Sequence, residues 1–416
     1  MAKHIKHESR VQNLEFASSW GQLSDQEKNY AYYMSKAAWA GVFINIHQIS
    51  YEGPIIFALF QAYFADKNFD ELQAAAMGGV EGLSQDDWKN FIAYVGGFYG
   101  NLSNYHNFGH MKFVPELAEE KFWGILRSHP KANEAGSPIN WALANLVDKI
   151  DKEIYAYDAP YTQLNFPHKG GVTAYFSRNM TEEDLNLVSE FLASGECVRK
   201  GLDVLNTRAF KINDSEFLIT VGSANTDGSC NMTYKEKTFR VEFGEFQEYC
   251  AEMNDYLTKA LPYVANETQK LMLEKYIESY ATGSIPAHKD SQRAWIKDKS
   301  PVVETNQGWI ETYIEPTNAR AYYEAWVAIV DKEKSRKFQA LVTNSEQIIP
   351  QMPWPREMEK DNFLAPEFTT LDIICFAANG CPLGINVPNY DDIRDNEGFK
   401  NVFLNNSMGS YTMNAV

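Results

Sequence analysis

The sequence lacks a disulfide pattern. Its 416 residues include five cysteines, an odd number with no C-x-x-C pair, and this usage is typical of a reducing compartment. The amino-terminal residues lack the apolar run of a signal peptide. No segment has the roughly 18 consecutive apolar residues that could span a membrane. We therefore expect a soluble cytoplasmic protein without a membrane partner.

A basic region is also missing. The formal net charge is −17, and Lys and Arg alternate with other residues, as in KEKSRK (332–337). Such a chain would be repelled by a phosphate backbone, so we expect no nucleic-acid partner. A small cationic or zwitterionic partner, such as the amine of a peptide, is compatible with this charge, although net charge alone does not select one.

Motifs of several common enzyme classes are absent. There is no G-x-S-x-G elbow, and VGGFYG (95–100) lacks the neighbouring strand and Lys-Ser/Thr of a phosphate-binding loop, so we interpret it as close helix packing. A zinc-binding helix needs a second histidine one turn after a His-Glu pair. The pair His7-Glu8 is followed by Val11 and Gln12 instead.

The stretch NYHNFGHMKFVP (104–115) contains the best candidate chemistry. His106 and His110 have a spacing that would put both rings on one face of a helix. Asn107 and Gly109 lie between them and favour a turn, which weakens a metal-site interpretation. Two interpretations stay open: surface residues without a role, or an acid/base or ligand-contact pair that titrates near neutral pH.

The hydrophobic pattern indicates an α+β fold with a large core, since 44% of residues are hydrophobic and 14% aromatic. Apolar residues first recur at helical spacing and then alternate as in strands, including a hairpin around Asn213-Asp214. Helices are predicted at 24–49, 53–65, 84–102, 181–194, 268–284 and 332–352. Strands are predicted at 207–224, 237–246, 301–316 and 321–331.

Several long strings resemble the dipeptidyl peptidase III family. The similarity is collinear from about Gln22 to the last dozen residues. The strings that carry it include YAYYMSKAAWAG (30–41), FYGNLSNYHNFGHMKFVP (98–115), PVVETNQGWIETYIEP (301–316), PWPREMEKDNFLAPEF (353–368) and GINVPNYDDIRDNEGFKNV (384–402). These are too long and specific to be generic patterns.

The resemblance implies a two-lobed cytosolic zinc exopeptidase that removes dipeptides from the amino-terminus of short peptides. Its zinc site uses an H-E-x-x-G-H helix and a Glu from an E-E-x-x-A-E helix, and neither motif occurs in residues 1–416. The family cofactor is zinc, but no ligand can be assigned to this chain. We therefore predict no metal site and no cofactor, and leave open whether the chain is an enzyme.

The resemblance also implies how the chain is organised. We expect a helical amino-terminal region (1–204) that packs on a small β-barrel-like core (205–330), as in the lower lobe of the family. Residues 331–365 would be a helical segment of the otherwise missing upper lobe, and 366–416 an irregular return to the lower lobe. Without that lobe, we expect the segment 330–365 either to fold back onto the remaining lobe or to mediate self-association or partner binding. Its apolar side chains are Phe338, Leu341, Ile348, Ile349, Met352 and Trp354.

By the same resemblance, seven residues are predicted to bind substrate: Asn104, Phe108, Glu304, Asn306, Gly308, Asn386 and Asn389. Glu304 matches an acid that holds the free amine of the peptide. Asn386 and Asn389 match asparagines at the same end of the dipeptide. Asn306 replaces a tyrosine that assists at the scissile carbonyl. No catalytic residue can be carried over, and His106 and His110 remain the only candidates.

These observations favour a dipeptidyl peptidase III-like protein that binds short peptides or a small ligand without hydrolysing them. One alternative is a metal-free enzyme that uses His106, His110 and Glu304 for proton transfer. Another is a shortened form of a dipeptide-releasing zinc aminopeptidase. Asn306 favours divergence over simple shortening, because a shortened peptidase should have kept the tyrosine.

Overall fold

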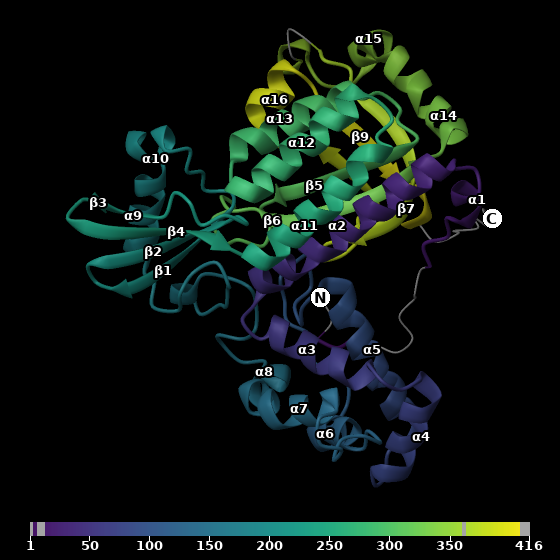
Figure 1. The fold of residues 1–416 in the computed structure, drawn as a ribbon, viewed down its shortest axis with the longest axis vertical. Helices are drawn as coiled ribbons and strands as arrows, with labels where there is room; N and C mark the ends of the chain where they lie inside the picture. The colour runs from purple at the N-terminus through teal and green to yellow at the C-terminus, as the bar shows by residue number, and fades with distance from the viewer. Residues whose placement is uncertain (1–2, 6–12, 360–362, 408–416) are drawn as a thin grey trace.

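The computed structural model describes residues 3–5, 13–359 and 363–407 (Figure 1). Helices dominate the first half of the chain. They are α1 (Ala17–Trp20), α2 (Asp25–Ile49), α3 (Gly53–Phe64), α4 (Phe69–Gly79), α5 (Gln85–Asn101), α6 (Glu119–Arg127), α7 (Pro138–Asn145), α8 (Asp151–Tyr155), α9 (Glu182–Leu192) and α10 (Gly195–Arg199). Within these described ranges, no helix is long and apolar enough to cross a lipid bilayer.

The predicted helices in this half are confirmed as α2, α3, α5 and α9. Helix α2 begins at a capping box, in which Ser24 accepts from the Glu27 backbone and the Glu27 carboxylate accepts from the Ser24 backbone at 2.7 Å. Ser84 and Asp87 form the same arrangement at α5, and α9 has it too. These caps satisfy backbone donors that a helix start leaves free, so they fix where each helix begins.

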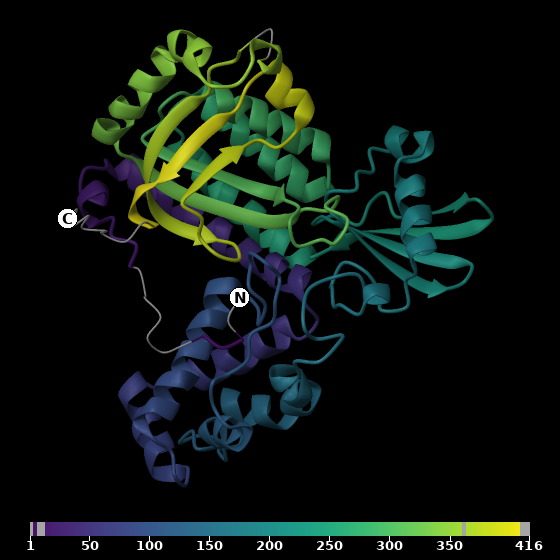
Figure 2. The same cartoon turned by 180° about the vertical axis from the view of Figure 1, so that it is seen from behind.

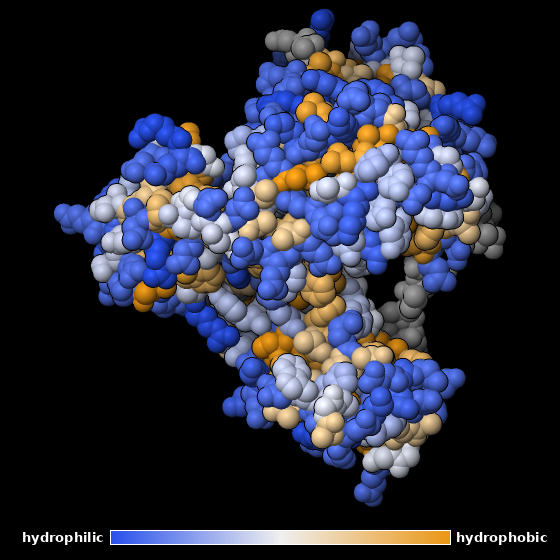
Figure 3. Space-filling model, viewed as in Figure 1, coloured by the Kyte–Doolittle hydropathy of each residue, from blue (hydrophilic) through white to orange (hydrophobic). Residues whose placement is uncertain are grey.

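Two hydrophobic cores organise the molecule. The smaller one lies within helices α3 to α8 and is built largely from aromatic rings, such as the stacked Trp88 and Phe91. The larger one joins α2 to the sheets and to the later helices. Figure 1 shows the α3–α8 helices as a separate lobe below the rest. The surface seen from this side is mostly hydrophilic, with a short hydrophobic band across the upper helices (Figure 3).

A four-stranded sheet has the order β1-β2-β4-β3. Its strands are β1 (Thr207–Asn213), β2 (Glu216–Gly222), β3 (Cys230–Tyr234) and β4 (Lys237–Glu245). The predicted hairpin is confirmed: β1 and β2 are antiparallel, and Asn213 lies opposite Glu216. Strand β2 pairs with β4 in parallel, so the sheet is mixed.

A five-stranded half-barrel sheet has the order β5-β6-β7-β9-β8. Its strands are β5 (Val303–Glu311), β6 (Tyr322–Val330), β7 (Glu367–Ala377), β8 (Gly384–Val387) and β9 (Lys400–Leu404). The predicted neighbours β5 and β6 are confirmed as an antiparallel pair. Figure 2 shows the sheet from the side opposite to Figure 1. The predicted α+β class is confirmed.

The expectation that 366–416 is irregular is wrong for its described part, which supplies three of these strands. Strand β7 is buried at most of its positions, so it lacks the alternation that identifies a half-buried strand. Strands β8 and β9 are only four and five residues long. The turn residues between these short strands hide the strand pattern in the sequence, so the sequence alone predicts an irregular segment.

Three helices follow β4 and precede β5 in the sequence: α11 (Gln247–Ala260), α12 (Glu267–Thr282) and α13 (Ile285–Lys297). The predicted helix at 268–284 is α12, which ends at Gly283 with φ +74°. Helix α13 was not predicted, although it holds both edges of the half-barrel. Its His288 contacts β5 through the carbonyl of Gln307. Its Arg293 pairs with Glu397 at 2.6 Å, just after α16 (Asp391–Asn396).

A buried ion cluster spans the half-barrel. Lys400 of β9 lies 3.0 Å from Glu304 of β5 and 3.3 Å from Glu367 of β7, and Lys400 and Glu304 are 0% and 1% exposed. Strand β5 is three steps from β9 in the sheet order, which would be about 14 Å in a flat sheet at ~4.8 Å per step. Direct contact is possible only because the sheet curls.

The segment 331–365 folds back onto the sheet in part. Helix α14 (Lys332–Thr343) places Phe338 against Phe368, with ring centroids 4.5 Å apart, and α15 (Ser345–Ile348) follows. The helix predicted at 332–352 is therefore divided before Pro350. Other apolar side chains of the segment remain exposed, and Leu341 is 56% exposed.

Replacing Lys400 with methionine should destabilise the fold strongly, because Glu304 and Glu367 would remain buried without their cation. Breaking a buried ion pair in this way costs about 3–5 kcal/mol. Urea unfolding should show this loss for Lys400→Met. Lys235→Met, which removes an exposed pair with Glu190, should change stability by less than about 1 kcal/mol. Equal stability of Lys400→Met and wild type would contradict this role.

Candidate functional site

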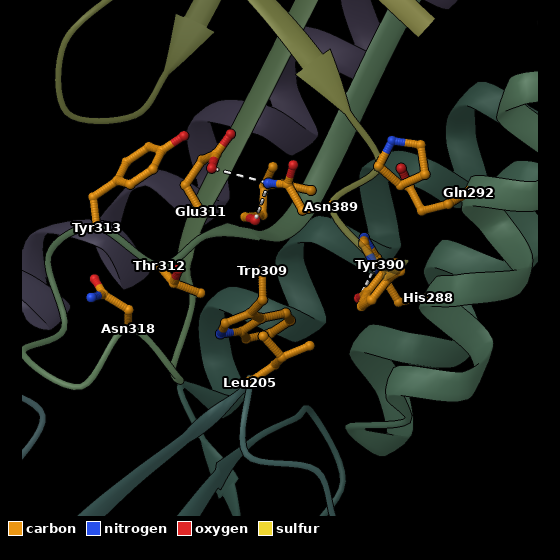
Figure 4. Close-up of a pocket in the computed structure, with 12 residues that line it drawn as sticks. Leu205, His288, Gln292, Trp309, Glu311, Thr312, Tyr313, Asn318, Asn389 and Tyr390 are labelled. Atoms are coloured by element: carbon orange, nitrogen blue, oxygen red, sulfur yellow. Dashed lines mark hydrogen bonds between the residues drawn. The ribbon is translucent and has the colours of Figure 1, made fainter. Parts of the chain in front are cut away.

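A groove lies at the end of β5, beside α13 and the chain that connects β8 to α16. It consists of two pockets of about 360 and 240 Å³ that share the side chains of Glu311 and Tyr313. Figure 4 shows the larger pocket, whose walls include His288, Trp309, Asn389 and Tyr390. The smaller pocket is lined by Asn107, Phe108, Tyr322, Glu324, Asn379 and Asn386, among others. We call the two pockets together the groove.

Two acidic residues dominate the electrostatics of the groove. Glu324 on β6 is 5% exposed, and burial together with the charge of Glu311 raises its pKa to about 8. Burial also raises the pKa of Glu311, while hydrogen bonds from Tyr313 and Asn389 and the charge of Arg394 oppose that rise. A bound cation would favour the charged form of both carboxyl groups and would offset the effect of Glu311 on Glu324.

Asn389 fixes the position of Glu311. Its side-chain amide donates to the Glu311 carboxylate at 3.0 Å and to the Ile310 carbonyl at 3.1 Å (Figure 4). The strand register shifts between Trp309 and Glu311, so the end of β5 departs from regular pairing. A bulge at a strand end re-aims a side chain. Here the shift coincides with Glu311 lining both pockets.

His288 is held as a neutral imidazole. The Tyr390 hydroxyl donates to Nδ1 at 2.8 Å, and Nε2 donates to the Gln307 carbonyl at 3.0 Å. Burial lowers the pKa of His288 to about 4. A Cβ on Gly308 would lie 2.0 Å from His288 Nε2, so this site requires glycine. Because both ring nitrogens are engaged, His288 joins the groove walls together and leaves no lone pair for a ligand.

Three predicted substrate-binding residues line the groove. Asn389 belongs to the larger pocket, and Phe108 and Asn386 belong to the smaller one. The Asn386 side chain donates to Asn401 on the paired strand β9. Residues 104–115 and 384–390 therefore do border one groove, although they are far apart in the sequence.

Glu304, Asn306 and Gly308 lie beneath the groove wall. They alternate along β5, so they share one strand face, and all three meet α13: Trp295 donates to Glu304 at 2.6 Å, Asn306 donates to Gln292 at 2.9 Å, and Gly308 meets His288. The expected capture of a peptide amine by Glu304 does not fit this arrangement, because its carboxylate is enclosed and bonded to Lys400. Asn104 is likewise fully buried.

His106 and His110 occupy a turn, as Asn107 and Gly109 indicated. The His106 backbone donates to the Met111 carbonyl at 2.9 Å, and His110 has φ +58°. The His106 ring contacts Phe113 with centroids 4.9 Å apart. Burial lowers the pKa of His110. Neither histidine lines the described pockets, although Asn107 and Phe108 between them do.

Sequence reasoning missed Glu311, Glu324 and Tyr313. One signal was available: Glu324 is the only charged residue in the strand AYYEAWVAIV (321–330). Charged side chains are rarely fully buried without a partner. A lone acid in an apolar strand is therefore a candidate functional carboxyl.

Comparison with known proteins decides the family. The model of peptidase family M49 matches residues 146–415, well over half of the chain. The chain belongs to peptidase family M49. It is 38% identical over 410 residues to dipeptidyl peptidase 3 of Homo sapiens, covering 95% of this chain and 54% of that protein. It is 37% identical over 426 residues to the Nematostella vectensis protein of that name, covering 98% and 57%.

Solved structures of this family share the fold. DPP III from Caldithrix abyssi matches with a TM-score of 0.59 at 15% identity, covering 97% of this chain and 58% of that one. Dipeptidyl-peptidase III from Corallococcus sp. strain EGB matches with a TM-score of 0.52 at 14% identity, covering 96% and 57%. The M49 chain thus spans little more than half the length of the relatives it matches.

The described residues of this M49 chain do not fit a zinc ion. Nowhere in residues 3–5, 13–359 and 363–407 do three or more His, Cys, Asp or Glu side chains come together so as to hold a metal. Within the groove, the imidazole of His288 is already bonded through both nitrogens.

Removing the Glu324 carboxyl should stabilise the protein in a pH-dependent way. Folded Glu324 keeps its proton up to about pH 8, whereas an unfolded glutamate releases it near 4.5. Wild-type stability therefore falls, through this group, as pH rises across that window. Glu324→Gln should gain up to a few kcal/mol between about pH 4.5 and 8, measured by urea unfolding at several pH values.

The matched control is Glu357→Gln, which changes an exposed glutamate outside the groove. Its stability difference from wild type should stay small and flat with pH. A pH-independent difference for Glu324→Gln would show that Glu324 ionises in the folded protein as it does in the unfolded chain.

Proposed function

We propose that the groove binds the amino-terminus of a short peptide, with Glu311 and Glu324 receiving the ammonium group. The observation that carries this proposal is that a buried and a half-buried carboxyl group, Glu324 and Glu311, line one pocket. Burial disfavours the ionisation of both, and the charge of Glu311 further disfavours that of Glu324. An ammonium group has three donors and one positive charge. It would therefore satisfy both carboxylates and remove their repulsion.

The surrounding groups suit a peptide backbone. Asn386 and Asn389 bring side-chain amides to the groove, and Tyr313 brings a hydroxyl. Strand β5 is at the edge of its sheet, which is the position where an extended peptide can add as a further strand. Two backbone carbonyls of β5, those of Gln307 and Ile310, already accept hydrogen bonds from His288 and Asn389. A peptide strand would therefore pair with the other backbone groups of β5.

Membership of family M49 supports a peptide ligand, and the matched relatives are called dipeptidyl peptidase 3. We propose binding without hydrolysis for the described residues. A role as the peptide-binding part of a zinc peptidase is the second proposal, favoured by the similarity to relatives about twice as long. The metal-free enzyme has less support, because Glu304 is enclosed and His106 and His110 lie outside the described pockets.

Calorimetry with a tetrapeptide and its N-acetyl form tests the amine role. The free peptide should bind more tightly, and Glu311→Gln should weaken it by about tenfold or more, since a charge-assisted hydrogen bond contributes ~1.5–3 kcal/mol. The acetylated peptide should be affected much less by the same substitution. Glu357→Gln should change neither affinity. Equal binding of free and acetylated peptides would contradict the proposal.

We further propose that the exposed apolar side of 331–365 contacts a second copy of the chain. The exposed apolar side chains there are Leu341, Ile348, Met352 and Trp354. Phe338, in contrast, packs on the rings of Phe368 and Phe403 in the sheet. A group of exposed apolar side chains of this kind often marks an interface.

Light scattering over a concentration series tests this contact. The mass of wild type should rise with concentration, whereas Leu341→Glu combined with Ile348→Glu should remain monomeric. The control combines Ile212→Glu with Leu271→Glu, two residues that are each 46% exposed elsewhere, and should associate like wild type. A wild-type mass that stays monomeric at all concentrations would refute the contact.

A further inference from the structure

A pocket of about 540 Å³ lies where α2, α3 and α11 meet, and it shares no lining residue with the groove. Figure 1 shows α3 along the upper side of the lobe formed by α3 to α8, below α2. The walls include the side chains of Phe43 and His47 from α2, Phe57 and Ala58 from α3, and Tyr249 from α11. We call this cavity the three-helix pocket. Its volume is in the range that holds a small organic ligand.

Helical spacing builds two walls of the three-helix pocket. Phe43 and His47 are four residues apart on α2, so they lie on the same face of that helix. Phe57, Ala58 and Gln61 share a face of α3 for the same reason. Ala58 has only a methyl group there, which leaves room between the helices. Phe57 packs against both hydrophobic cores, so the pocket lies where the two cores meet.

Three aromatic rings, one from each helix, converge on the three-helix pocket. The ring centroid of Phe43 lies 5.3 Å from that of Tyr249 at an interplanar angle of 20°, and 5.6 Å from that of Phe57 at 89°. All three rings are only partly buried, so each keeps some surface that a ligand could cover. Aromatic rings attract another ring in offset-stacked or edge-to-face arrangements. The wall of the pocket therefore suits a flat aromatic ligand.

His47 supplies a hydrogen-bond acceptor in this aromatic wall. Its Nδ1 donates to the Phe43 carbonyl at 2.7 Å, so the lone pair of the neutral ring is on Nε2. Among the described residues, none forms a hydrogen bond with this Nε2. Burial lowers the pKa of His47, which keeps the ring neutral. Arg208, which lies near His47, donates to Glu245 at 2.7 Å, so these two charges match each other. The pocket thus offers an unbonded acceptor without a net charge.

We infer that the three-helix pocket binds a neutral, planar aromatic molecule with an N–H or O–H group, and that this group donates to Nε2 of His47. The rings of the ligand would cover the partly buried rings of the wall and remove apolar surface from water. Its donor would bond to the acceptor that the protein leaves unbonded. A charged ligand is disfavoured, because its charge would leave water without a partner. This site is independent of the proposed amine site.

Calorimetry with indole and benzofuran tests the site, because benzofuran has the same two rings with an oxygen in place of the N–H. Wild type should bind indole about threefold or more tightly than benzofuran, the factor that a neutral hydrogen bond contributes. His47→Phe should bind the two probes within about twofold of each other. Ala58→Trp should fill the pocket and weaken indole binding by about tenfold or more. The matched control Ala74→Trp, at an exposed position of α4, should bind indole like wild type.

NMR of protein labelled with ¹⁵N in its histidines reports on the acceptor directly. The Nε2 resonance of His47, assigned with His47→Phe, should move when indole binds and move much less with benzofuran. Four results would overturn the inference: no saturable binding of indole, equal affinity of wild type for the two probes, undiminished binding by folded Ala58→Trp, or an Nε2 resonance that indole does not move. If Ala58→Trp does not fold, the affinity ratio of wild type and the NMR shift test the site without it.

Discussion

The buried contact between Lys400 and Glu304 is the constraint on which the rest of the structure depends. It joins strands that are not neighbours, so it is compatible only with a curled sheet. The curl brings the far edge, β8 and the chain after it, towards β5, where Asn389 reaches Ile310 and Glu311. Helix α13 spans the same two edges through His288 and Arg293. The groove exists because these elements meet.

The two ends of β5 show how environment decides what a glutamate does. Glu304 is bonded to Lys400 and Trp295, so its charge is matched inside the protein. Glu311 and Glu324 line one pocket, where the charge of Glu311 raises the pKa of Glu324, while Arg394 and Asn389 partly stabilise the charge of Glu311. A carboxylate that is paired with a buried cation stabilises the fold. Two carboxyl groups that share a pocket favour the binding of a cationic group from a ligand. In this account, the first holds the half-barrel together and the second gives the groove its chemistry.

Much of the fold could be predicted from the sequence, because local signals are strong where they occur. The Ser24 and Ser84 caps, the Asn213 turn and the adjacent strands β5 and β6 all carry such signals. Strands β7 to β9 could not be predicted, because one is buried on both faces and the others are very short. Helix α13 follows α12 after Gly283 and Ser284, too closely for the pattern to separate them.

The site was predicted only in part, for a different reason. The matched motifs pointed to Phe108, Asn386 and Asn389, which line the groove in the structure, and their role in binding stays a prediction. The motifs could not show that Glu304 contacts Lys400. That contact depends on the register of the strands and the curvature of the sheet, which no local sequence pattern encodes. The alternation of Glu304, Asn306 and Gly308 shows that they share a face, but not that α13 covers it.

The central claim is that the carboxyl groups of Glu311 and Glu324 together bind a cationic group of a ligand. NMR titration of protein labelled with ¹³C at the glutamate carboxyls tests it most directly, with resonances assigned by Glu311→Gln and Glu324→Gln. The account predicts a midpoint near pH 8 for Glu324 that falls when a free-amine peptide saturates the groove. A midpoint near the ordinary value of 4.5, or one that the peptide does not move, would contradict it.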